Sequence, residues 1–146
     1  RDNLTTQPRL TVVEGTIGDP ALVNRAFDEF KPEVVVHAAA AYKDPNNWVE
    51  DSRTNVLGTS IVTQAAQRLG VRRFIYFQTA LCYGLHPLEQ PITLSHPIRP
   101  EGSSYAISKT AGASDAMRCR RRNACHSGEP CSRPSMISQC AVTPSP

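Results

Sequence analysis

The chain has 146 residues, of which 40% are hydrophobic and 20% are charged, and its formal net charge is +3. This composition is typical of a globular protein with one modest core. No apolar run reaches the length of about 18 residues that a membrane-spanning helix needs, and the first residues lack the apolar segment of a signal peptide. We therefore expect a cytoplasmic protein without a membrane partner.

The first predicted elements are a strand and a helix. Residues 10–17, LTVVEGTI, form a short β-branched run that contains a glycine near its end, a pattern typical of a strand. Asp19 then suits the N-cap of a helix, Pro20 suits its first position, and Pro32 lies beyond its end.

The same alternation continues along the chain. Residues 33–41, EVVVHAAAA, are a continuous apolar run, which favours a strand buried on both faces of a parallel sheet. Residues 55–70, NVLGTSIVTQAAQRLG, predict an amphipathic helix closed by Gly70. Residues 71–80, VRRFIYFQTA, return to a strand pattern. This order predicts an α/β fold with a parallel sheet and right-handed crossovers.

A loop with Pro87, Pro91, Pro97 and Pro100 leads to the stretch YAISKTAG, which places Tyr105 and Lys109 four residues apart. On a helix these two side chains lie on one face. A cation near a phenol favours the phenolate, so the pair could serve as a general acid or base. Taken alone, the same spacing is also common on ordinary surface helices.

Three stretches should meet at the carboxyl ends of the strands, where ligands of such sheets bind: HAAAAYKDP, QTALCYG and YAISK. The small residues Ala38 to Ala41 would let a flat cofactor approach the backbone, although a plain buried strand end is an equal alternative. Thr79 offers a hydroxyl there, or is simply a β-branched strand residue. We expect His37 to pack at its strand end and not to transfer a proton.

The last segment, residues 113–146, differs in composition from the rest. It holds the excess of positive charge, little apolar surface and the cysteines Cys119, Cys125, Cys131 and Cys140. Their spacing lacks the close pairs of a zinc site, so no metal is predicted. Residues 113–146 are predicted to be a disordered tail. The basic run at residues 118–122 has no interleaved aromatic residues, and we expect no nucleic-acid partner.

Taken in order, VVVHAAA, NVLGT, FIYFQTALCYG and YAISK resemble the extended short-chain dehydrogenase/reductase family, in its nucleotide-sugar epimerase and dehydratase branch. The resemblance covers roughly residues 10–112. It implies a partial NAD(P)-binding domain over residues 1–112, with a Rossmann-type doubly wound parallel sheet that lacks its first βαβ unit. It also implies a homodimer for the intact family member.

The resemblance assigns a role to each residue of the site. It implies that Tyr105 is the catalytic acid/base, that Lys109 lowers the pKa of Tyr105 and binds the nicotinamide ribose, and that Thr79 hydrogen-bonds the sugar oxygen. The implied cofactor is NAD rather than NADP. Besides Tyr105 and Lys109, the residues that resemble the family's cofactor-binding positions are Ala38, Ala39, Ala40, Asn55, Thr16, Ile17 and Phe77.

By this resemblance the expected reaction is epimerisation of a nucleotide sugar by transient hydride abstraction, in surface polysaccharide or sugar metabolism. The family's dehydratases carry an acidic pair after the threonine, whereas this chain has Ala80 and Leu81. Epimerase is therefore favoured over dehydratase or simple reductase. Two alternatives belong to other classes of function: a non-catalytic Rossmann-like module, and a basic tail that binds nucleic acid.

Two parts of the family pattern have no counterpart in this sequence. The glycine-rich pyrophosphate turn and the acidic ribose ligand are absent, because Gly15 and Gly18 follow the wrong strand. The sugar-binding half is replaced by the segment after Gly112. We therefore expect this chain to be an inactive fragment that binds NAD weakly.

Overall fold

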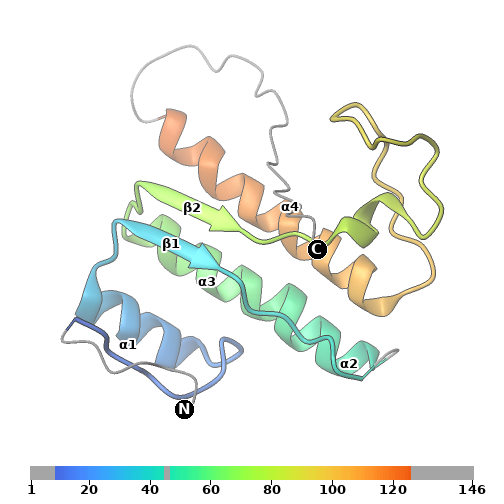
Figure 1. Cartoon of the computed structure of the whole chain (residues 1–146). Coiled ribbons are helices and arrows are strands. Elements are labelled where there is room, and N and C mark those ends of the chain that lie inside the picture. Colours follow the sequence, from blue (N-terminus) through green and yellow to red (C-terminus); the bar gives the residue numbers. More distant parts are fainter. Residues whose placement is uncertain (1–8, 45–46, 126–146) are drawn as a thin grey trace.

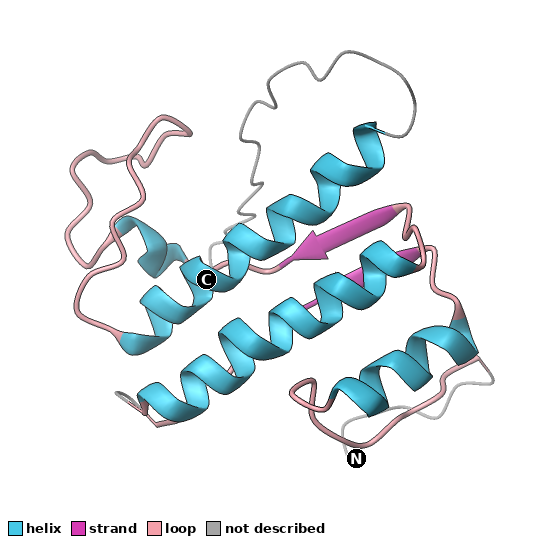
Figure 2. Cartoon of the chain, turned by 180° about the vertical axis from the view of Figure 1, so that it is seen from behind, coloured by secondary structure: helices cyan, strands magenta, loops and turns pink. Residues whose placement is uncertain are grey.

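The computed structural model describes residues 9–44 and 47–125. It is an α/β structure in which two parallel strands lie against three longer helices, α1, α3 and α4 (Figure 1). Seen from behind, the helices all lie in front of the strands, so they cover the same face of the sheet (Figure 2). None of the helices within these ranges is long and apolar enough to cross a membrane.

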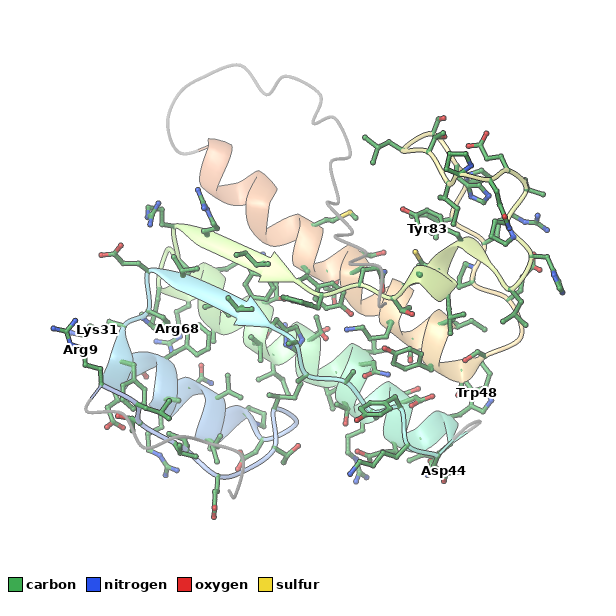
Figure 3. All side chains as sticks on the ribbon, in the orientation of Figure 1. Arg9, Lys31, Asp44, Trp48, Arg68 and Tyr83 are labelled. Atoms are coloured by element: carbon green, nitrogen blue, oxygen red, sulfur yellow. The ribbon has the colours of Figure 1, made fainter. Side chains whose placement is uncertain are left out.

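The helix predicted after Asp19 is confirmed as α1, Pro20–Phe30. The Asp19 carboxylate accepts hydrogen bonds from the backbone N–H groups of Ala21 and Leu22, and Pro20 occupies the first turn, where its missing N–H costs nothing. Arg68, on α3, donates to Asp28 on α1 at 2.6 Å, and Figure 3 shows its side chain reaching towards that helix.

The sheet consists of β1, Val34–His37, and β2, Arg73–Tyr76, in a register that runs from Val34 beside Arg73 to His37 beside Tyr76. Val35 and Phe74 pack against buried residues of α1 and α3 and form the core with them. Val34 and Val36 point the other way and are 41% and 57% exposed. The expectation of a strand buried on both faces is therefore wrong within the described residues.

The strand predicted over residues 10–17 is also wrong, because the structure shows no strand there. A strand needs a neighbour to take its backbone hydrogen bonds. In the described part of the chain β1 pairs with β2 and with nothing else. Leu10, Val12 and Val13 are each close to half exposed.

The predicted helix over residues 55–70 is the end of a longer helical segment. This segment begins with α2, Trp48–Asp51, continues as a π-helical stretch, η1, Ser52–Gly58, and ends with α3, Thr59–Arg68. Gly70 follows in the left-handed region with φ of 64°, a conformation that favours glycine and terminates the helix as predicted.

The helix predicted to begin near Tyr105 is α4, Ser104–Cys125. Ordered structure therefore does not end at Gly112, and the prediction of a disordered tail is wrong for residues 113–125. Ala113 and Ala116 are buried, and Asp115 accepts a short hydrogen bond from Ser60 of α3. These two alanines, one helical turn apart, let this part of α4 pack against α3. Residues 126–146 of the predicted tail lie outside the described residues.

At Gly112, α4 comes very near the helical segment that contains Asn55. A Cβ atom at this position would overlap the backbone oxygen of Asn55 and would lie 3.2 Å from both the Thr59 and the Tyr76 hydroxyls. Because backbone cannot move aside as a flexible side chain can, residue 112 must lack a side chain.

This constraint predicts the effect of Gly112→Ala. In an exposed helix position alanine is more favourable than glycine by about 1 kcal/mol. At residue 112 we expect the reverse, a loss of about 1 to 3 kcal/mol from overpacking. Urea unfolding measures the difference. The exposed neighbour provides the control, since Ala111→Gly should lose about 1 kcal/mol through helix propensity. A Gly112→Ala variant as stable as the parent chain would contradict the close approach.

Candidate functional site

The predicted meeting of three stretches at the carboxyl ends of the strands is confirmed. Both strands point towards the end of the molecule that holds α2 and the short 3₁₀ helix η2, Ala80–Tyr83 (Figure 1). In the side-chain view Asp44 and Trp48, the first residue of α2, lie at this end, and so does Tyr83, the last residue of η2 (Figure 3). The first turns of α4 lie between them.

Asn55 connects the loop after β1 with α4. Its Oδ1 accepts from the backbone N–H of Ala41 at 2.9 Å, and its Nδ2 donates to the Ala41 carbonyl at 3.2 Å and to the Ser108 hydroxyl at 3.0 Å. The side chain is fully buried. Both amide protons are thus used inside the protein, so this residue holds the loop and the helix in place.

Tyr105 and Thr79 are brought together, Thr79 at the end of β2 and Tyr105 in the first turn of α4. The Thr79 hydroxyl interacts with the Tyr105 phenol, and Thr79 Oγ1 accepts from the backbone N–H of Leu81 at 3.2 Å. Burial raises the pKa of Tyr105, the interaction with Thr79 opposes this rise, and the negative charge of Asp51 adds to it. The phenol is therefore protonated at neutral pH.

The expected lowering of the Tyr105 pKa by Lys109 stays a prediction. The two residues do share α4, but the Lys109 ammonium lies over the ring of Tyr76, 4.1 Å from the ring centroid. Lys109 is 2% exposed, and burial lowers its own pKa to about 8. The i, i+4 spacing fixes a shared helix face, but it does not fix where a long side chain ends.

Asp51 is a site residue that the sequence reasoning missed. Its carboxylate accepts from the hydroxyl of Ser104 at 2.5 Å, and both side chains are almost fully buried. The contact ties α2 to the residue immediately before Tyr105. The available signal was its position four residues before Asn55, which places both on one side of the same helical segment.

His37 packs at the end of β1, as expected, with its ring edge-on to Tyr76. Its Nε2 lies 2.8 Å from Thr59 Oγ1, and that hydroxyl donates its proton to the Asn55 carbonyl. The tautomer of His37 decides which of the two atoms donates in this contact. Burial, assisted by the positive charge of Lys109, lowers the pKa of His37 to about 4.

Two cavities lie beside the loop after β1. One, of about 300 Å³, is lined by Thr16, Ile17, Ala38 and Ala39 together with residues of α1 and β1. The other, of about 200 Å³, is lined by Ala40, Ala41 and Tyr42 and by polar residues including Asp51. The alanine stretch thus has open space on both sides. Phe77 lies apart from both, with its side chain 56% exposed.

The lining of the larger cavity fits a flat, partly apolar group such as a nucleoside. The lining alanines let a ligand approach the backbone, and Thr16 and Ile17 line the same cavity. Within residues 9–44 and 47–125, no group of three or more His, Cys, Asp or Glu side chains could hold a metal ion.

Comparisons with known proteins agree with this arrangement. The model of the NAD dependent epimerase/dehydratase family matches residues 1–128. A UDP-glucose 4-epimerase of Rhizobium leguminosarum bv. trifolii is 34% identical over 67% of this chain and 32% of its own length. A mouse dTDP-D-glucose 4,6-dehydratase is 35% identical over 68% of this chain and 28% of its own length. The chain thus spans about a third of the length of these curated relatives.

A solved structure shows the same likeness at higher identity. The Bordetella bronchiseptica enzyme WbmH, in complex with NAD⁺, is 51% identical and superposes with a TM-score of 0.78. The match covers 82% of this chain and 40% of that one. The Rossmann-type fold expected from the sequence is therefore confirmed.

The state of His37 predicts how stability depends on pH. Because its pKa is about 4 in the folded chain and 6.5 when unperturbed, the unfolded chain binds more protons between these values. Stability should fall as the pH drops from 6.5 to 4, by about 3 kcal/mol from this residue. Urea unfolding across this range should show a shallower fall for His37→Gln. The exposed His86 is the control, and parallel curves for His37→Gln and His86→Gln would contradict the assignment.

Proposed function

Because the chain belongs to the NAD-dependent epimerase/dehydratase family, we propose that its Tyr105, Thr79 and Lys109 form the acid/base site of an NAD-dependent nucleotide-sugar epimerase. The observation that carries this proposal is that Thr79, at the carboxyl end of β2, and Tyr105, in the first turn of α4, interact through their side chains. The activity belongs to a protein of the relatives' full length that carries these residues.

NAD is the proposed cofactor, and Thr16, Ile17, Ala38 and Ala39 are its proposed contacts on the adenosine side, because they line the larger cavity. Support comes from WbmH, whose structure contains NAD⁺, and from the related WbmG, solved with NAD and UDP at 52% identity. When bound, NAD⁺ supplies the hydride acceptor and a positive charge. Asn55 contributes by holding the loop after β1, since its amide protons are already used.

The protein's own groups move the proton. Tyr105 accepts the proton of the sugar hydroxyl as that carbon is oxidised, and it returns the proton when the keto group is reduced on the opposite face. Thr79, which interacts with Tyr105, orients the sugar oxygen. The raised pKa of Tyr105 makes the phenol its resting form, which suits the reductive half. Positive charge added with the cofactor favours the phenolate that the oxidative half requires.

A dehydratase is the second candidate, since relatives of that activity match at similar identity. The residues after Thr79 favour the epimerase, because Ala80 and Leu81 offer no acid or base for the removal of water. A homodimer, a cytoplasmic location and the absence of a nucleic-acid partner remain predictions from the sequence.

The test is turnover of UDP-sugars with NAD by a full-length protein that carries these residues. An epimerase converts the sugar without a change of mass, whereas a dehydratase yields a product lighter by one water. Tyr105→Phe should lower kcat by about 10² to 10⁴ while KM changes little, because the proton acceptor is lost and the ring is kept. Thr79→Val should cost about 1 to 3 kcal/mol of transition-state stabilisation.

Phe30→Leu is the control, because Phe30 ends α1 just before β1 begins, at the opposite end of the strands from the site. It should keep the parent kcat. Parent-like turnover by Tyr105→Phe would refute the proposed role of the tyrosine.

A further inference from the structure

Lys109 is a buried cation whose charge needs compensation. It is 2% exposed, and no carboxylate forms an ion pair with it in the described ranges. Removing an ammonium from water without such a partner is strongly unfavourable. The contact that the structure gives this ammonium is the face of the Tyr76 ring, 4.1 Å from its centroid.

Tyr76 also contacts the backbone of the same residue. Its hydroxyl donates to the Lys109 carbonyl oxygen at 3.0 Å, so one side chain of β2 meets both ends of Lys109. The absence of a side chain at Gly112 leaves room for this hydroxyl, since a Cβ there would lie 3.2 Å from it.

We propose that Tyr76 is a positioning residue for Lys109, with its ring holding the ammonium and its hydroxyl holding the helix backbone from which that side chain starts. The consequence for catalysis rests on the proposed function, whereas the contact itself does not. A cation on an aromatic face is stabilised in its charged form. The ring therefore keeps Lys109 charged and in place in a site that excludes water.

The titration of Lys109 can be measured without overlap from His37, Tyr76 or Tyr105. The titratable groups of the site include His37 on β1, Tyr42 on the loop after β1, Tyr76 on β2, Asp51 on α2 and Tyr105 on α4 itself, while η1 and α3 contribute the neutral Asn55 and Thr59. Burial lowers the pKa of His37 to about 4 and raises the pKa of Tyr76 and of Tyr105 above the usual range. His37, Tyr76 and Tyr105 therefore stay neutral around pH 8, where Lys109 titrates.

The experiment is lysine-selective NMR of the chain, whose lysines are Lys31, Lys43 and Lys109. With ¹³C- and ¹⁵N-labelled lysine, one Hε signal should be shifted upfield by the Tyr76 ring and should titrate near pH 8, well below the other two. Lys109→Arg assigns it. Nuclear Overhauser contacts between this Hε and the Tyr76 ring protons should be present. Their absence in the unmutated chain would overturn the proposal without any variant.

Two substitutions separate the ring from the hydroxyl. Tyr76→Leu should abolish the upfield shift and lower the titration midpoint by about 0.4 to 1.5 pH units, because the charged form loses its stabilisation. Tyr76→Phe should keep both the shift and the midpoint, because the ring remains.

Phe74→Leu is the matched control, since it removes a ring from the same strand and the same face, where Phe74 packs on Ala66 and Val71. Its midpoint should equal that of the parent. A parent-like midpoint in Tyr76→Leu, or an equal fall in Phe74→Leu, would overturn the proposal.

This inference and the proposed function fail separately. If Tyr105→Phe keeps full turnover in the full-length protein, the acid/base assignment fails while the NMR result still stands. If the NMR titration gives either of the overturning results, the role of Tyr76 fails while the assay of Tyr105 is unaffected.

Discussion

The site depends on how closely α4 crosses the helical segment that contains Asn55. The missing side chain at Gly112 permits the approach, and the approach brings Ser108 within hydrogen-bonding distance of the Asn55 amide. Because the same amide binds both backbone groups of Ala41, a single residue fixes the loop after β1 relative to the helix of Tyr105 and Lys109. A site assembled in this way is rigid where three elements meet, which is what catalysis by oriented groups requires.

The interior around this contact is polar. Large side chains without solvent exposure include Lys109, Asn55, Thr59 and Ser104, whereas the apolar core on α1 and α3 is small. Buried polar groups are unfavourable unless each finds a partner, and a low local dielectric strengthens those partners when they are found. Asp51 with Ser104 and His37 with Thr59 follow this rule. Burying these polar groups lowers the stability of the fold, and the same burial shifts the pKa values of the titratable groups. Such shifts are typical of functional sites.

The sequence predicted those elements whose signals are local. Asp19 and Pro20 mark the start of α1, Gly70 marks the end of α3, and the Tyr105–Lys109 spacing indicates a helix. The strand over residues 10–17 could not be judged in this way, because a strand exists only with a neighbour that may be distant in sequence. The extent of α4 was missed because the composition after Gly112 outweighed the two alanines that pack on α3.

The site shows the same division between local and long-range information. The order of motifs identified the family and placed Thr79, Tyr105 and Lys109 at one end of the sheet. The rise in the pKa of Tyr105 could not be predicted, since it depends on burial and on Asp51, which no motif indicated. The sequence analysis assigned Tyr76 no role, because its contacts with Lys109 through ring and hydroxyl join elements that are distant along the chain.

The exposed face of the sheet has a consequence of a different kind. Val34, Val36, Ile75 and Phe77 alternate with the residues that face the helices, and they are between 39% and 57% exposed. Two strands with apolar side chains on both faces behave as an interior layer, and such a layer in water attracts any surface that can cover it. Within residues 9–44 and 47–125, β1 pairs only with β2, so its other edge offers backbone groups that another copy could extend. The strands that build the site thus also determine how readily the chain associates with itself. The concentration up to which it stays monodisperse depends on how well the exposed face of the sheet is covered.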